Sequence, residues 1–343
     1  MSFQRFNPFG SVEGSKIFAI LCLLVVTCIY TAANSDRFVL PGNIENVIHR
    51  TSLFGILSIG VAFVIITGGI DLSIGSVVCL AGVLLPMLVR KYEWSLAGSV
   101  IAVTVMSAGI GLIHGLLITK VRLQPFVVTL CGLLIYRGIA RGITKDVTQG
   151  FGSDERFDGL RALARKTYTI INSDSFEFNL RATVIILIVI TIAAIILLNR
   201  TVFGRYLMAI GSNVEAARYS GINTDRVTTL AYVICSTLAG IGGMLFVLDI
   251  NQAQPSSFGN FYELYAIAAA VLGGCSLRGG EGNIIGVVIG AALMQVLYNT
   301  INLVHPQYQS IELAIIGGVI LGGVTIDAIA RRVISARQTK LRE

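Results

Sequence analysis

The chain has 343 residues, of which 54% are hydrophobic and only 13% charged, and its mean hydropathy is +0.78. A soluble domain usually carries about 25% charged residues, so this composition excludes a water-soluble globular protein. The net charge of +7 does not indicate a nucleic-acid partner, because the basic residues cluster at the ends of apolar runs, as the positive-inside bias of membrane proteins explains.

Most of the sequence consists of apolar runs with roughly the 20 residues that a helix needs to cross a hydrocarbon core. Helices are the expected spanning elements because backbone groups in lipid must form their hydrogen bonds within the segment. The predicted spans are 17–33, 49–67, 72–89, 95–118, 122–142, 181–198, 227–249, 263–280, 283–304 and 311–330. We therefore expect an all-α protein, a polytopic transmembrane helical bundle of about ten spans that forms one domain over residues 1–343.

The first run ends near residues 31–33, which resemble a signal-peptidase site, but we interpret it as an uncleaved span because more membrane segments follow. Basic residues are dense in the segment 199–226, after the sixth span, and in the tail 331–343. The positive-inside rule places both in the cytoplasm, and the six preceding spans place the N-terminus there too. Arg90 and Lys91 then lie outside, against the rule.

A glycine-rich interruption lies between the second and third spans and contains Gly68, Gly69, Asp71 and Ser73. Glycines allow a helix to unwind and line a water-filled path at membrane depth, so we take these four residues as candidates for a translocation pathway. An ionisable residue at that depth usually faces a cavity or a partner. The alternative for Asp71 is that it only caps the helix that begins near Ser73.

Two loops are long enough to have a role of their own. Residues 143–180 are polar, carry charges of both signs and are predicted to be extracytoplasmic, either as a docking surface or as a solvated cap. The cytoplasmic segment 199–226 contains a predicted short helix, which Ser212 or Asn213 can cap and Gly221 can end. That helix is a candidate contact for a cytoplasmic partner, and a linker turn is the alternative.

A second glycine-rich interruption follows in the C-terminal half and adds Gly273, Gly274 and Ser276 to the pathway candidates. Both interruptions begin with Gly-Gly and reach a serine shortly afterwards. Corresponding glycine-rich breaks in two halves point to a transporter binding site. The charges of Arg278 and Glu281 favour an ordinary cytoplasmic turn instead.

The remaining small and polar residues of the spans are interpreted as packing residues. Small residues recur at four-residue spacing in the last two spans: Gly282, Gly286, Gly290, Gly318 and Gly322. Such faces allow close helix contact, within one bundle or between subunits, and we favour the first. His114 is expected to be a hydrogen-bonded packing residue, and the six cysteines are expected to be buried free thiols.

Motifs for catalysis and nucleotide binding are missing. The sequence contains no G-x-x-x-x-G-K-[ST] phosphate loop, no H-E-x-x-H and no G-x-S-x-G, and its three histidines lie far apart. We therefore expect a transporter subunit without a cofactor of its own rather than an enzyme. Energy for active transport would come from a gradient or from a partner.

Three motifs resemble a known family: GGIDLSIGS at 68–76, NVEAARYSGI at 213–222 and LGGCSLRGGEGNIIG at 272–286. They are similar to those of the ribose-type sugar permeases of bacterial ABC importers, which are related to the branched-chain amino-acid permeases. The resemblance covers essentially the whole chain. Cys275 departs from it, because threonine or a similar small residue is expected there, and no family motif matches residues 154–168.

The resemblance implies a permease in the bacterial inner membrane with a second permease copy, identical or paralogous, as its partner. It also implies a cytoplasmic ATPase, which would hold ATP and Mg²⁺, and a periplasmic binding protein that delivers sugar. The short cytoplasmic helix resembles the coupling helix that contacts the ATPase. Its residues are Asn213, Glu215, Ala216, Ala217, Arg218, Ser220 and Gly221. Glu215 and Arg218 can pair with charges on the ATPase.

The resemblance therefore implies import of a monosaccharide, a ribose-like pentose or hexose, or of a related polyol, driven by ATP hydrolysis in the partner. Two alternatives stay open. A gradient-driven sugar carrier or channel would need a titratable relay, for which Asp71 alone is thin support. A membrane-embedded transferase or hydrolase would need clustered catalytic residues, which the sequence does not contain.

Overall fold

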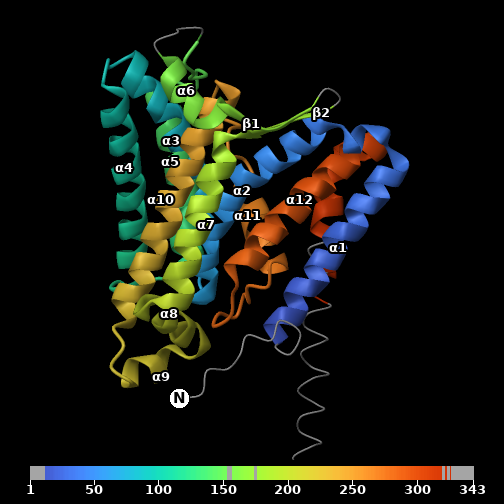
Figure 1. Cartoon of the computed structure of the whole chain (residues 1–343). Helices are drawn as coiled ribbons and strands as arrows, with labels where there is room; N and C mark the ends of the chain where they lie inside the picture. Colours follow the sequence, from blue (N-terminus) through green and yellow to red (C-terminus); the bar gives the residue numbers. More distant parts are fainter. Residues whose placement is uncertain (1–11, 153–156, 174–175, 319–320, 323–324, 326–343) are drawn as a thin grey trace, which may run out of the picture.

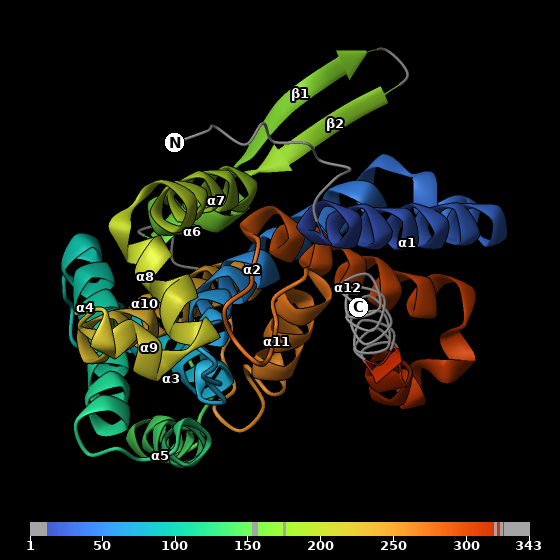
Figure 2. The same ribbon diagram turned by 90° about the horizontal axis from the view of Figure 1, so that it is seen from below.

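Two helices that are apolar on nearly every side form the centre of the molecule: α2 (Pro41–Ile66) and α10 (Thr224–Ile250). In α2 every residue from Thr51 to Ile66 is buried. A helix that is hydrophobic all round is stable only where other helices or lipid surround it. Figure 2 shows the other long helices arranged around this pair.

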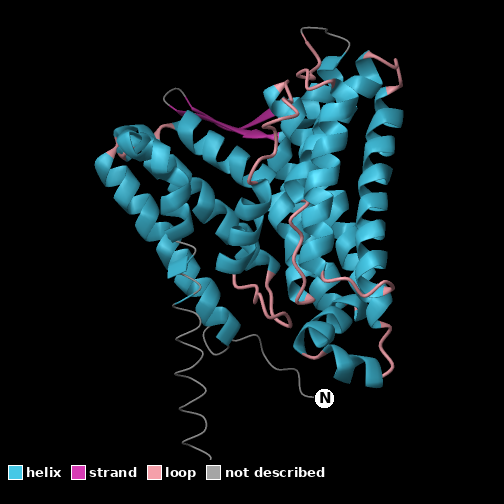
Figure 3. Cartoon of the chain, turned by 180° about the vertical axis from the view of Figure 1, so that it is seen from behind, coloured by secondary structure: helices cyan, strands magenta, loops and turns pink. Residues whose placement is uncertain are grey.

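The computed structural model describes residues 12–152, 157–173, 176–318, 321–322 and 325. Its other long helices are α1 (Val12–Asn34), α3 (Ile74–Arg90), α4 (Leu96–Thr119), α5 (Pro125–Thr144), α7 (Ala182–Arg200) and α12 (Ile284–Val304). The shorter helices are η1 (Asp36–Val39), α6 (Asp158–Arg165), α8 (Val202–Ser212), α9 (Val214–Tyr219), α11 (Tyr262–Leu272) and η3 (Pro306–Ile311). Helix dominates the chain, which confirms the all-α prediction (Figure 3).

The outer helices present large apolar side chains away from the protein. Six of these residues, on α1, α4, α5 and α7, expose at least 60% of their surface: Val26, Ile29, Ile101, Val105, Leu134 and Val189. A water-soluble protein rarely exposes contiguous apolar area on this scale, whereas a surface that faces lipid requires it. The ring of exposed apolar side chains therefore agrees with a helical bundle embedded in a membrane.

Seven of the described helices are long and apolar enough to cross a membrane: α1, α2, α4, α5, α7, α10 and α12. Two apolar helices are shorter, α3 with 17 residues and α11 with 11 residues. The expected number of about ten spans is not confirmed, because the last predicted span, 311–330, lies partly outside the described residues.

The predicted eighth span, 263–280, is wrong in its extent. The helix begins as expected but α11 ends at Leu272, and residues 273–283 form an irregular connection to α12. The physical reason is the pair Gly273 and Gly274. Gly274 has φ +97°, a left-handed conformation that glycine adopts without a steric penalty and that ends a helix.

The predicted loop 143–180 contains regular structure: helix α6 and an antiparallel hairpin of β1 (Thr167–Ser173) and β2 (Phe176–Arg181). Charged side chains attach it to the end of α10, since Asp249 accepts from Arg181 at 2.9 Å and lies 3.0 Å from His49 of α2. Arg165 of α6 also donates to the Asp249 carbonyl oxygen. The base of this segment is thus a packed cap, and the hairpin projects beyond α7 (Figure 2).

Among the described residues, the small-residue face of α12 packs within the chain. A Cβ added at Gly286 or Gly290 of α12 would overlap the backbone of α11, at Gly273 and Ala269 respectively. This confirms close intramolecular contact for α12. In contrast, a Cβ at Gly318 would meet no described atom within 4 Å.

All six cysteines are free, as expected, but only three are buried by protein: Cys79, Cys235 and Cys275. The expectation of burial is wrong for Cys22 and Cys131, which are exposed. Both lie on outer helices, where a thiol can face lipid instead of the protein interior.

Candidate functional site

The first glycine-broken segment connects α2 to α3. Gly68 has φ +80° and its N–H donates to the Ile65 carbonyl oxygen at 2.8 Å, which closes the last turn of α2. Helix α3 begins only at Ile74, so the intervening residues leave the helical conformation. Because 17 residues of helix extend about 25 Å, less than a hydrocarbon core of about 30 Å, α3 alone is too short to cross the membrane.

Asp71 is fully buried in this segment, and its two oxygens have different surroundings. Oδ1 accepts from the Ser73 N–H at 2.8 Å and from the Ser73 hydroxyl at 2.6 Å, one residue before α3 begins. Oδ2 accepts no N–H or O–H hydrogen bond from the described residues. Asp71 therefore does stabilise the start of α3, as the capping alternative expects, and keeps one carboxylate oxygen available.

Polar side chains from three helices surround Asp71. The Tyr232 hydroxyl of α10 donates to the Ile70 carbonyl oxygen at 3.3 Å, and the Cys235 thiol lies next to the Asp71 carboxyl. His114 of α4 is buried and bonded to the Tyr136 hydroxyl at 2.9 Å, which agrees with its expected packing role. Such a buried polar cluster at membrane depth is costly and usually has a function.

Two charged residues close to this cluster were missed from the sequence. Glu263, in the first turn of α11, is buried against the first turn of α3, where a Cβ at Gly75 would overlap its Oε2. Arg137 of α5 donates to the carbonyl oxygens of Pro255 and Phe258 at 3.1 and 2.5 Å. Both lie inside predicted apolar spans. An ionisable residue within such a span is a functional candidate, so the sequence alone could have identified them.

The second glycine-broken segment forms a compact turn between α11 and α12. Ser276 is buried, its N–H donates to the Glu281 carbonyl oxygen at 3.1 Å and its hydroxyl accepts from the Arg278 N–H at 3.3 Å. Gly279 and Gly280 have φ +85° and +77°. The segment is thus a turn, as its charges suggest, and a glycine-dependent one.

The two interruptions meet each other, and Gly68 of the first Gly-Gly pair takes part, but the second pair, Gly273 and Gly274, does not. The Gly280 N–H donates to the carbonyl oxygen of Ile66, the last residue of α2, at 2.9 Å. A Cβ at Gly279 would lie 2.8 Å from the Gly68 nitrogen. Gly273 instead packs on α12, at Gly286. Contact between the two segments therefore runs through Gly279 and Gly280, which were not among the candidates.

The short helix expected within residues 199–226 forms as α9. Asn213, not Ser212, caps α9: its side-chain oxygen accepts from the Ala216 N–H at 3.0 Å. Gly221, with φ +82°, follows the helix and donates from its N–H to the Arg218 carbonyl oxygen at 3.0 Å. Ala217 is the buried residue of α9 and anchors it to the bundle.

The outward face of α9 carries the charges and one aromatic residue. Glu215 and Arg218 form an exposed ion pair at 3.2 Å within the helix. Tyr219 exposes 88% of its surface, more than any other large apolar or aromatic residue that the structure describes as exposed. Tyr219 was not among the candidates, although an aromatic residue among the small and polar residues of a loop helix could have indicated an interface. Figure 1 places α9 at one end of the bundle.

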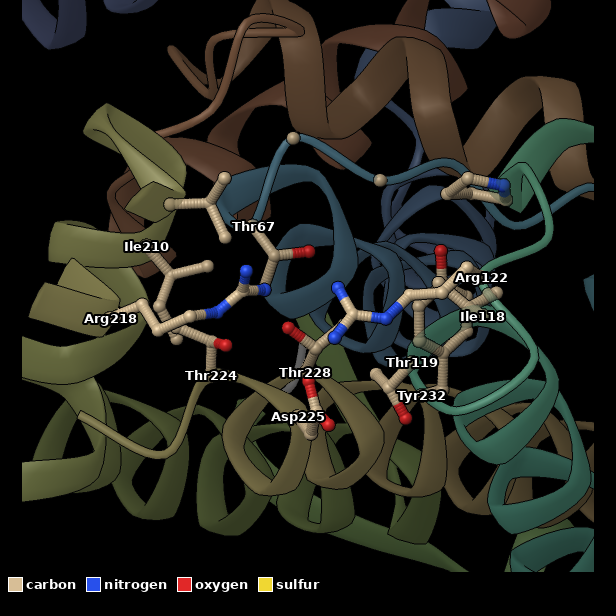
Figure 4. A pocket seen from close by; sticks show the side chains of 14 residues that line it. Thr67, Ile118, Thr119, Arg122, Ile210, Arg218, Thr224, Asp225, Thr228 and Tyr232 are labelled. Atoms are coloured by element: carbon tan, nitrogen blue, oxygen red, sulfur yellow. The ribbon is translucent and has the colours of Figure 1, made fainter. Parts of the chain in front are cut away.

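A cavity of about 220 Å³ lies between α9 and the first glycine-broken segment. Its lining comes from the first segment, the α4–α5 connection and helices α8, α9 and α10. Figure 4 shows the guanidinium groups of Arg122 and Arg218 pointing toward one another inside it, with Asp225 nearby. Gly68 and Gly69 form part of its wall and Tyr232 its inner end, next to Ile70. The cavity thus connects the surface at α9 with the neighbourhood of Asp71.

No cluster of three or more histidine, cysteine, aspartate or glutamate side chains in the described part of the chain is placed to hold a metal ion. The buried polar groups are instead carbonyl oxygens, hydroxyl groups and carboxylates that can exchange hydrogen bonds with a polyhydroxylated ligand or with water.

Comparison with known proteins identifies relatives over most of the chain. Residues 43–324 match the family described as branched-chain amino acid transport system, permease component. The ribose import permease protein RbsC of Escherichia coli (strain K12) is 35% identical over 328 residues, covering 94% of this chain and 96% of that protein.

Of two further relatives, one is named for a different sugar and the other for no particular substrate. The xylose transport system permease protein XylH of Haemophilus influenzae is 29% identical, with 92% of this chain and 97% of that protein covered. A probable ABC transporter permease protein, y4mJ, of Sinorhizobium fredii is 34% identical over 77% of this chain and 74% of its own length. No solved structure gives a significant match.

Proposed function

Because the chain belongs to the branched-chain amino acid transport system permease family, and is a membrane permease subunit of a sugar ABC importer, we propose that its cargo is a monosaccharide of the pentose class. Relatives with similar coverage are named for ribose and for xylose, which are both pentoses. The chain is a multi-pass membrane protein and a transporter subunit rather than an enzyme.

The exposure of helix α9 supports the proposal that an ATPase drives the transport. It is a capped helix at the tip of the bundle, held from inside by Ala217 and exposing Glu215, Arg218 and Tyr219. We expect these residues to enter a cleft of the ATPase, with Tyr219 as the aromatic anchor, since aromatic residues dominate binding energy at interfaces. ATP and Mg²⁺ would be bound by that partner, and a second permease copy completes the transporter.

The end of the bundle that carries α9 is proposed to face the cytoplasm, together with both termini. The basic residues Arg200, Arg205 and Arg226 flank this end, as the positive-inside rule requires. The opposite end, with α6 and the hairpin, would then receive sugar from a periplasmic binding protein.

The translocation pathway is proposed to involve the two glycine-broken segments. In the first, Gly68, Gly69, Asp71 and Ser73 combine irregular backbone with a carboxylate oxygen that accepts no N–H or O–H hydrogen bond from the described residues. The corresponding residues of the second segment are Gly273, Gly274 and Ser276. Irregular backbone at membrane depth is tolerated where it lines a cavity or is buried in protein, and buried protein contacts account for Gly273.

The test is to purify the tagged chain in mild detergent with whatever binds to it, and to reconstitute the complex in liposomes. We expect an ATPase to co-purify, and ATP hydrolysis to rise when a periplasmic protein loaded with D-ribose or D-xylose is added. Transport of the labelled sugar should require ATP on the side of the liposome membrane that α9 and the bound ATPase face.

Two results would contradict the proposal. If the chain purifies alone and a proton gradient drives its sugar transport without ATP, it is a gradient-driven carrier. If the complex forms but responds only to binding proteins loaded with a different class of solute, the pentose assignment is wrong while the importer assignment stands.

A further inference from the structure

Three backbone segments from distant parts of the sequence meet in close contact. They are Ile66–Gly69 at the end of α2, Gly211–Ser212 at the end of α8, and Arg278–Gly280 between α11 and α12; we call this meeting point the glycine junction. A Cβ at Gly211 would overlap both the Ile66 carbonyl oxygen and the Gly280 nitrogen. A Cβ at Gly280 would lie 2.5 Å from the Ser212 hydroxyl oxygen and 3.0 Å from its nitrogen.

The contacts of the glycine junction are rigid. Most of the facing atoms belong to backbone and the Ser212 side chain is short, so little at the contact can absorb a displacement of one segment against another. One hydrogen bond crosses it, from the Gly280 N–H to the Ile66 carbonyl oxygen at 2.9 Å. That carbonyl belongs to the last turn of α2, where helical partners are missing, so the bond also satisfies a helix terminus.

Each segment leads directly to a candidate functional element. Ser212 is followed by Asn213, the cap of α9, so α8 and α9 join without a linker. Ile66–Gly69 leads into Asp71 and the start of α3. Arg278–Gly280 leads, through two residues, to Asn283, the cap of α12. The junction therefore lies where the ATPase contact and both glycine-broken segments come together.

The cavity next to the junction leaves space for movement. Gly68 and Gly69 line one side of it, and Ile210 of α8 with Val214 and Arg218 of α9 line another. A volume of about 220 Å³ is several times the roughly 30 Å³ that one water molecule occupies, so the walls can approach or separate while water enters or leaves.

We propose that the glycine junction transmits movement of α9 to both glycine-broken segments, and that Gly211 and Gly280 are positioning residues for ATP-driven transport. This inference rests on the proposed function. A shift of the α8–α9 unit pushes the end of α2 and the turn before α12 together, so the surroundings of Asp71 and Ser276 change in the same step.

The first test substitutes Gly211→Ala in the reconstituted importer. The matched controls are Gly138→Ala and Gly142→Ala, helical glycines of α5 where a Cβ meets nothing within 4 Å. Coupling between two sites typically changes an affinity 5- to 150-fold, so we expect sugar uptake per ATP hydrolysed to fall about tenfold or more in Gly211→Ala only. Amounts of bound ATPase and basal ATP hydrolysis should remain.

The outcomes separate the junction from the proposed function. If the wild-type complex shows no ATP-dependent uptake, the proposed function fails and the inference fails with it. If the wild type transports and Gly211→Ala couples hydrolysis to uptake as well as the two controls do, the junction does not transmit movement and only the inference is overturned.

A second measurement uses the unaltered chain, so it also decides the matter if Gly211→Ala fails to fold. Hydrogen exchange by mass spectrometry is compared for the reconstituted importer with and without ATP plus vanadate. We expect exchange to change together in residues 66–73, 211–219 and 277–283. A change confined to 211–219 would overturn the inference.

Discussion

Asp71 combines two roles through its two oxygens. Oδ1 holds the turn that starts α3 by accepting from the backbone and hydroxyl of Ser73, whereas Oδ2 accepts no N–H or O–H hydrogen bond from the described residues. A buried carboxylate at membrane depth is costly, and a residue of this kind is usually kept for function. The two roles can be separated by substitution.

Asp71→Asn should impair sugar uptake and leave the fold intact. Asparagine keeps an oxygen that can accept both hydrogen bonds from Ser73 but removes the charge, and interactions of a charged group contribute about 1.5–3 kcal/mol, so we expect a loss of about tenfold or more. Uptake by the reconstituted importer and thermal unfolding in detergent are the measurements.

Asp71→Ala is the comparison, because it removes both the cap and the charge and should also destabilise the protein by about 1 kcal/mol. If Asp71→Asn transports normally and only Asp71→Ala unfolds more easily, Asp71 is a capping residue alone.

Tyr219→Ala should weaken binding of the ATPase without unfolding the chain, because the ring is 88% exposed and packs on little of this protein. Aromatic anchors at interfaces typically contribute about 2 kcal/mol or more, so the dissociation constant should rise about thirtyfold. Tyr92→Ala, an exposed tyrosine in the α3–α4 turn at the other end of the bundle, is the matched control. If the ATPase binds both variants with equal affinity, Tyr219 is not part of the interface.

Some of these residues are visible in the sequence and others are not. Asp71 stands out because a carboxylate between two apolar runs is costly and usually has a function. Glu263 and Arg137 are also ionisable residues within predicted apolar spans, but no glycine-rich break in the sequence draws attention to them. Gly211, Gly279 and Gly280 do not stand out, since their role depends on backbone atoms 68 or more positions away along the chain, such as those of Ile66 for Gly211. Local pattern holds no information on such contacts.

At the scale of elements, α9 is the clearest case of local sequence dictating structure. Its cap, its first-turn acid and the glycine that follows it are all within ten residues, and the helix forms where they predict. The ion pair between Glu215 and Arg218 is exposed, so it contributes little to stability, about 0.3–0.5 kcal/mol. Its charges are therefore free to serve recognition.

Exchanging the two charges, Glu215→Arg with Arg218→Glu, should uncouple ATP hydrolysis from uptake while the helix stays folded. The exchanged pair can still form within α9, but it presents each charge to the wrong position of the ATPase, and like charges across an interface cost several kcal/mol. Uptake and hydrolysis are measured together. Full uptake by the exchanged variant would count against α9 as the coupling element.

Elements that depend on distant contacts are harder to predict. The apolar run 263–280 is long enough for a span, yet α11 stops at Leu272, where the Gly273–Gly274 pair ends the helix and Gly273 packs backbone to backbone on α12. The hairpin of β1 and β2 forms in a polar stretch whose base is attached by Asp249, 68 residues beyond Arg181. In both cases a tertiary contact overrides the local pattern.

For the whole molecule, alternating helix directions place α9 and the α3–α4 turn at opposite ends (Figure 1). Composition predicted the membrane bundle correctly, because 13% charged residues leave no alternative surface. The number of spans could not be fixed in the same way, since short helices such as α3 and α11 count as spans only when their neighbours are known.

The orientation can be measured with single cysteines in a chain freed of its native six. A membrane-impermeant maleimide should label Glu93→Cys from the periplasmic side and Glu215→Cys only in inverted vesicles, because basic residues flank the α9 end. Labelling of both from one side would contradict the arrangement of the helices. The reverse pattern would invert the proposed topology.

The brevity of α11 has a consequence for biogenesis. Eleven residues of helix extend about 16 Å, so α11 cannot partition into the bilayer as a span when it leaves the translocon, and it carries the buried Glu263. It is held between an earlier and a later helix: the Phe54 ring of α2 lies tilted against the Tyr262 ring, with centroids 4.9 Å apart, and α12 packs on Ala269. Insertion of α11 must therefore wait until α12 has been synthesised, and a nascent chain released before that point would present this segment to the quality-control proteases of the membrane.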